Sequence, residues 1–225
     1  AYYFLYVYSD TKMTSSTQDT QLTDMQNVVE DDAHSQTLAE FSLESANYLS
    51  LNVETVSLAQ VQEQIRNISE RMRTAGITTP VEFTVTDQTN TPIAFSRFVM
   101  LTGMKFPEEI VSVADEEFSL FIKIDQGKTR VGLRVLLKQA DTTPLVFRKA
   151  EGDFLFALQN MYFEAKVSPV KKAIFKQGVY HDIPVRYSNV PGVENLSVDY
   201  TVVGNEWYIG TSKDTVRGML DYEKK

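Results

Sequence analysis

The stretch FSLFIKIDQGKTRVGLRVLLK, residues 118–138, constrains the fold more than any other part of the sequence. Apolar residues largely alternate with polar ones on both sides of the central DQGK, and a period of two is typical of β-strands. A glycine in such a short connection is typical of a hairpin turn. The stretch therefore predicts an antiparallel hairpin. Its inward face is expected to be formed by Phe118, Leu120, Ile122 and Ile124 on the first strand and by Val131, Leu133, Val135 and Leu137 on the second.

Three further segments carry strand signals. Residues 81–86, VEFTVT, alternate and predict a half-buried strand. The runs LSVDYTVV and WYIGTS flank Gly204 and Asn205, which predicts a second tight hairpin. The run GVYHDIPVRYSN contains Pro184, which cannot donate to a sheet ladder. We therefore expect either an edge strand or two short strands there.

Helix signals separate these strands. Ser57 and Gln60 form a capping box, and Gly76 supplies a left-handed stop, so a helix is predicted over 57–75. Short helices are expected over 95–104 and 107–114. Two more are expected from Thr143-Pro144 and from the cap residue Ser212; their inward residues would be Leu145, Phe154, Leu158 and Met161 in the first and Val216, Met219 and Leu220 in the second.

The order of these elements predicts an α+β fold. Because the strands occur mainly as hairpins, we expect a mainly antiparallel sheet with helices packed on one face. The ferredoxin-like split βαβ arrangement is the nearest simple template. This globular domain is expected over residues 57–225.

The charge is distributed unevenly along the chain. Residues 10–64 contain ten acidic residues and one basic residue, whereas residues 65–225 contain twenty acidic and twenty-one basic residues. Residues 10–56 are therefore expected to form an acidic linker followed by one or two stalk helices with a narrow apolar face. The net charge of −8 argues against a nucleic-acid surface, which needs clustered Lys and Arg.

The sequence begins with the apolar strip AYYFLYVY. It is too short to span a bilayer, which takes roughly 20 residues, but its tyrosines suit a membrane interface. We expect residues 1–9 to be the end of a single-pass membrane anchor, with the later domain on the extracytoplasmic side. A buried edge strand is the alternative. The anchor residues would be Tyr2, Tyr3, Phe4, Leu5, Tyr6, Val7 and Tyr8.

An anchor, a polar stalk and a small α+β domain together resemble the inner-membrane alignment proteins of type IV pilus and type II secretion systems, the PilO-like group. The ending GTSKDTVRGML after WYI also resembles the tail of uncharacterised membrane-anchored proteins of candidate-phylum bacteria. These resemblances imply an anchored bacterial domain outside the cytoplasm, and they assign no functional residue.

Few residues point to chemistry. His181 and Asp182 resemble half of a catalytic pair, but no nucleophile elbow accompanies them. The triplet Asp115, Glu116 and Glu117 and the cluster of His34 with Asp31 and Asp32 could hold a proton or a metal, although solvated faces explain both more simply. The acceptor pattern for N-glycosylation occurs at Asn67 and Asn195. The chain has no cysteine, and we expect no cofactor and no metal.

These observations favour a non-enzymatic, membrane-anchored protein that acts as a structural, assembly or surface interaction module. Its partners would be other proteins, including a second copy through the connector helix. The alternative is an extracytoplasmic ligand-binding or sensory domain, with a pocket lined by aromatic residues. These would be Tyr180, Tyr187, Tyr200, Trp207 and Tyr208, unless they simply fill the core.

Overall fold

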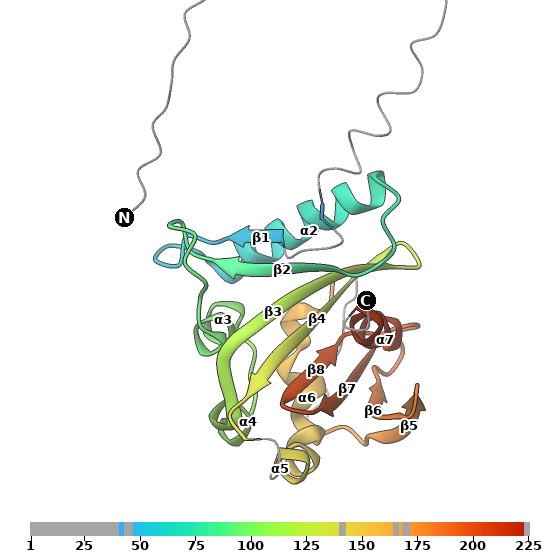
Figure 1. Cartoon of the computed structure of the whole chain (residues 1–225). Helices are drawn as coiled ribbons and strands as arrows, with labels where there is room; N and C mark the ends of the chain where they lie inside the picture. The colour runs from blue at the N-terminus through green and yellow to red at the C-terminus, as the bar shows by residue number, and fades with distance from the viewer. Residues whose placement is uncertain (1–40, 43–46, 140–142, 164–166, 168–171, 223–225) are drawn as a thin grey trace, which may run out of the picture.

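The computed structural model describes residues 41–42, 47–139, 143–163, 167 and 172–222 (Figure 1). Among these residues, eight strands form one sheet in the order β1-β2-β3-β4-β8-β7-β6-β5. Only β1 and β2 pair in parallel. The strands are β1 (Asn47–Ser50), β2 (Val81–Thr86), β3 (Ala114–Asp125), β4 (Lys128–Leu137), β5 (Lys176–Tyr180), β6 (Ile183–Asn189), β7 (Ser197–Val203) and β8 (Glu206–Gly210).

Most helices lie between these strands in the chain, and α7 (Lys213–Tyr222) follows the last strand. The other helices are α2 (Leu58–Thr74), α3 (Phe95–Thr102), α4 (Glu108–Val113), α5 (Thr143–Ala150) and α6 (Phe154–Ala157). The α+β class with a mainly antiparallel sheet is therefore confirmed. The unit β1-α2-β2 has its two strands side by side, whereas a split βαβ unit places another strand between them.

Local signals set the hairpins and the first described helix. The turn between β3 and β4 has positive φ at Gln126 and Gly127, as a type I′ turn requires. Gly204 takes the positive φ in the turn between β7 and β8. The Ser57 side chain accepts from the Gln60 backbone amide, and the Gln60 side chain accepts from the Ser57 amide, so the capping box of α2 is confirmed.

One face of the sheet, here called the core face, packs against α2 to α6. Trp207 is fully buried at its centre, with its ring centroid 4.8 Å from Phe147 and 5.2 Å from Phe106. The guanidinium of Arg186 pairs with both carboxylate oxygens of Glu151, and the Tyr200 hydroxyl donates to the same carboxylate at 2.7 Å. This network attaches the turn after α5 to β6 and β7.

Helix α7 lies on the opposite face, here called the α7 face, so the expectation that all helices cover one face is wrong. Phe121 and Tyr208 point toward this face and pack with Val216, Met219 and Leu220 of the helix. The helix approaches closely because the neighbouring strand residues Gly132 and Gly210 have no side chain. A Cβ at Gly132 would lie 2.5 Å from the Met219 sulfur, and one at Gly210 would lie 3.0 Å from Val216.

The segment after residue 143 is less regular than expected. The helix α5 gives way to a 3₁₀ turn at Glu151–Asp153, and α6 and a second 3₁₀ turn follow. Leu145 is 68 % exposed, which corrects its expected inward position, and Phe147 is buried instead. The interruption falls at Gly152, whose high backbone entropy disfavours a continuous helix.

The segment around Pro184 forms two strands, β5 and β6, which was one of the two expected outcomes. The chain reverses at His181 and Asp182, which both have positive φ, and not at the proline. Pro184 lies within β6 opposite Val179, and β5 is the edge strand.

The sheet includes part of the expected acidic connector. Residues 47–50 form β1, and Leu49 and Leu51 are buried in the core. The anchor residues 1–9 and the stalk residues 10–40, with His34, lie outside the described residues. Among the described residues, no helix is both long enough and apolar enough to cross a bilayer.

Replacing Gly132 with alanine should destabilise the domain by about 1–3 kcal/mol, because the new methyl group must displace the buried Met219. Urea unfolding followed by the fluorescence of the chain's one tryptophan, Trp207, measures this change. Gly178→Ala is the matched control, because its Cβ would meet only Tyr187 at 3.7 Å. Equal stability of the two variants would contradict the proposed close contact.

Candidate functional site

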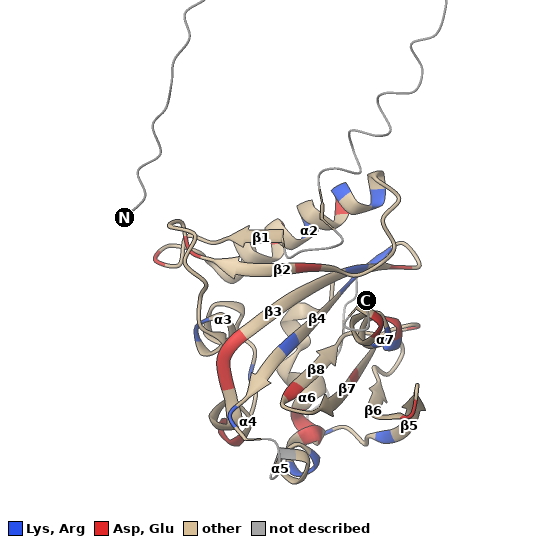
Figure 2. Ribbon diagram, viewed as in Figure 1, with Lys and Arg blue, Asp and Glu red and all other residues tan. Residues whose placement is uncertain are grey.

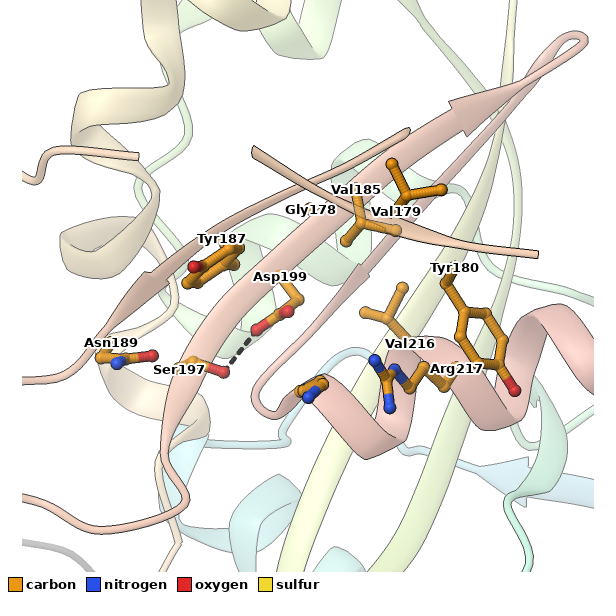
Figure 3. A pocket seen from close by; sticks show the side chains of 11 residues that line it. Gly178, Val179, Tyr180, Val185, Tyr187, Asn189, Ser197, Asp199, Val216 and Arg217 are labelled. Carbon is orange, nitrogen blue, oxygen red and sulfur yellow. Dashed lines mark hydrogen bonds between the residues drawn. The ribbon is translucent and has the colours of Figure 1, made fainter. Parts of the chain in front are cut away.

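A cavity of about 380 Å³ lies on the α7 face between α7 and strands β5, β6 and β7 (Figure 3). It is lined by Gly178, Val179, Tyr180, Val185, Tyr187, Asn189, Ser197, Asp199, Lys213, Val216 and Arg217. Apolar walls with a few polar groups and a volume of about 300–1,000 Å³ are typical of small-ligand sites. The cavity is therefore the candidate functional site.

The strand side of the cavity carries a buried carboxylate. Asp199 is only 3 % exposed, in the middle of β7 and opposite Gly210 of β8. Its Oδ1 accepts a hydrogen bond from the Ser197 hydroxyl, and no cation within the described part of the chain forms an ion pair with it. Burial raises the pKa of Asp199 from 3.8 to about 6, although the Ser197 hydrogen bond and the charges of Lys213 and Arg217 oppose this shift.

The helix side of the cavity carries two cations. The Ser212 hydroxyl caps α7 by accepting from the Thr215 amide at 3.2 Å, which sets the rotation of the first turn. Lys213 and Arg217 are four residues apart and so lie on one side of the helix. Neither forms an ion pair with a residue that the structure describes. The Arg217 guanidinium lies 4.7 Å from the centre of the Tyr180 ring.

Polar groups also gather beside the cavity at the turn between β5 and β6. The Tyr180 hydroxyl donates to Asp221 at 2.7 Å, and this hydrogen bond raises the pKa of Tyr180. His181 Nε2 lies 3.6 Å from Asp221 Oδ1, and the His181 side chain is 54 % exposed. His181 and Asp182 thus form an exposed turn, and the described contacts place no serine or threonine hydroxyl against the imidazole.

The expected aromatic pocket is divided between the two faces of the sheet. Tyr180 and Tyr187 line the cavity. Trp207 and Tyr200 point to the core face, and Tyr208 packs beneath α7. The aromatic residues therefore fill the core more than they form a pocket.

The acidic triplet lies at the start of β3 (Figure 2). Asp115, Glu116 and Glu117 are exposed, and the Glu116 carboxylate accepts from the Ser96 amide in the first turn of α3 at 3.0 Å. No group of three or more metal-ligating side chains is found within the described ranges.

The two glycosylation patterns lie in different settings. Asn67 is exposed on α2, but Ser69 is buried and donates to the Ile65 carbonyl oxygen. Asn195 is exposed in the loop before β7, and its pattern ends at the buried Ser197.

The sequence prediction did not identify Asp199, Ser197, Lys213 or Arg217 as site residues. One signal was present, since an aspartate in the middle of an apolar strand run is seldom fully buried without a partner. The pairing of that strand position with α7 depends on how the sheet and helix pack. No protein-family model matches the chain, and the comparisons with curated proteins and with solved structures found no match.

The raised pKa of Asp199 predicts a pH-dependent stability. Above its unfolded pKa of 3.8, the unfolded chain releases the proton while the native chain keeps it, so stability falls as the pH rises to about 6. The loss is about 3 kcal/mol, from 1.36 kcal/mol per pKa unit. Asp199→Asn should remove this component, which is measured as the difference in unfolding free energy between about pH 4 and pH 7.

Asp182→Asn is the control for this prediction, because Asp182 is exposed in a turn whose left-handed backbone asparagine also tolerates. Asp182→Asn should keep the pH dependence of the unmodified protein. The assignment to Asp199 fails if Asp199→Asn keeps it as well.

Proposed function

We propose that the described domain is a non-enzymatic domain that binds a small polar ligand between α7 and the β5–β7 strands. The observation that carries this proposal is the nearly fully buried Asp199 carboxylate, which faces an open cavity and is hydrogen-bonded by Ser197 alone among the described side chains. A buried charge without a compensating partner is costly. A ligand that donates to the free carboxylate oxygen would compensate it.

The surroundings of Asp199 suit recognition better than bond cleavage. The Ser197 hydroxyl donates to Asp199, whereas His181 lies against Asp221, and neither His181 nor Asp221 lines the cavity. Serine and histidine therefore engage different carboxylates. Valine side chains from β5, β6 and α7 line the cavity beside these polar groups, which is typical of a ligand site.

The sequence supports an extracytoplasmic location for this domain. We propose that residues 1–9 end a membrane anchor and that the acidic segment 10–56 contains a stalk. Lys and Arg are scarce after the apolar strip, as is typical of the non-cytoplasmic side of a membrane. The domain would then bind its ligand outside the membrane.

A structural or assembly role, as in the PilO-like proteins, is the second candidate. The edge strand β5 favours it, because Val179 is 64 % exposed and Ile174, just before the strand, is 88 % exposed. Exposed edge strands can accept a strand from a partner protein. In this role the connector helix would contribute to self-association.

Gly178→Val should abolish ligand binding while leaving the fold intact. The valine side chain enters the cavity from β5, and Gly178 has no positive φ that would strain it. Hits from a screen of small polar compounds by ligand-observed NMR should lose their signals with this variant. Gln177→Val adds the same side chain at the next position of the strand, which is outside the cavity lining, and should keep the hits. Hits that persist with Gly178→Val, or a screen without hits, would overturn the proposal.

A further inference from the structure

We infer that the cavity binds the zwitterion of an α-amino acid with an apolar side chain, with the ligand's ammonium group at Asp199 and its carboxylate at Lys213 and Arg217. This inference rests on the proposed ligand-binding function. The cavity has an acidic pole on the sheet and a basic pole on the helix (Figure 3), and an α-amino acid has the complementary pair of charges.

The acidic pole of the cavity is the Asp199 carboxylate, which can accept a hydrogen bond from a ligand. Asp199 is almost fully buried, and the Ser197 hydroxyl occupies one oxygen of its carboxylate. The Tyr187 side chain lies on the same face, since Tyr187 pairs with Asp199 across β6 and β7. An ammonium group in this position would contact a carboxylate and an aromatic ring, and both attract cations.

The basic pole of the cavity is formed by Lys213 and Arg217, which can bind an anionic group of a ligand. Lys213 lies in the first turn of α7, where the helix dipole adds positive potential, and Arg217 lies one turn later. The charges of both act on Asp199, yet neither approaches it within ion-pair distance. The opposite charges therefore face each other across the cavity without neutralising each other directly.

The two poles together disfavour ligands that carry only one kind of charge. Asp199 repels an anion, and Lys213 and Arg217 repel a monovalent cation. A ligand that carries both charges satisfies both poles at once. The walls contributed by Val179, Val185 and Val216 then suit an apolar side chain.

Isothermal titration calorimetry at neutral pH tests this inference with three sets of compounds. The first set is the amino acids L-valine, L-leucine, L-methionine and L-phenylalanine. The second set is the analogues of these amino acids that lack the carboxylate, and the third is the analogues that lack the ammonium group. We expect at least one amino acid to bind, and its amine and its acid each to bind at least about tenfold more weakly, because each lacks one charge contact.

Two variants assign the poles separately. Asp199→Asn should weaken the binding of the amino acid and of the corresponding amine, but not the binding of the corresponding acid. Lys213→Gln should weaken the binding of the amino acid and of the acid, but not the binding of the amine. Controls are Asp182→Asn and Lys176→Gln, which change exposed charges outside the cavity lining. Trp207 fluorescence verifies that each variant is folded, and Lys213 is itself exposed, so its replacement leaves the core unchanged.

The outcomes separate this inference from the proposed function. If an amine or an acid binds as tightly as the amino acid, and Gly178→Val abolishes that binding, the zwitterion inference is wrong and the ligand site stands. If none of the amino acids binds, the inference is overturned, and the NMR screen then decides the proposed function. If an amino acid binds equally well to Gly178→Val, it binds elsewhere and both proposals fail.

Discussion

Helix α7 touches the sheet at Gly132 and Gly210, where paired glycines on β4 and β8 leave no side chain between helix and strands. A third glycine, Gly218, brings the helix against the Pro80 ring, since a Cβ there would lie 2.5 Å from the proline Cγ. These contacts hold one side of α7 firmly against β3, β4 and β8. The side toward β5 and β6 is left to form the cavity roof. Because these contacts fix the position of α7 on the sheet, Lys213 and Arg217 lie opposite Asp199.

The core face supplies the rigidity that such a site needs. The buried Trp207 and the phenylalanine rings around it connect β8 to α3, α5 and α6. The network of Glu151, Arg186 and Tyr200 connects the same helical segment to β6 and β7. Asp199 therefore extends from a strand whose other face is tightly packed, and its carboxylate is held in place without a salt bridge of its own. A site on rigid elements keeps its geometry before the ligand arrives.

The candidate site also shows that burial, and not residue type alone, decides the chemical properties of an ionisable side chain. His181 and Asp182 looked chemically suggestive in the sequence, yet they form an exposed turn. Asp115, Glu116 and Glu117 lie at the surface, and one of them caps α3. Asp199 looked unremarkable within SVDYTVV, but its position under α7 raises its pKa and directs it into a cavity. These carboxylates differ in how far they are exposed to water, and that exposure depends on which segments cover them.

The sequence by itself determined the elements that depend on near neighbours in the chain. Alternation and turn residues predicted the β3–β4 and β7–β8 hairpins, and the capping box predicted α2. Only the tertiary structure decided that α7 covers the face opposite the other helices, that Leu145 points outward while Phe147 is buried, and that β1 joins the sheet from the acidic segment. Each of these depends on contacts between segments far apart in the chain. Helical hydrogen bonds, caps and tight turns act over three or four residues, whereas burial is shared among all the elements that pack together.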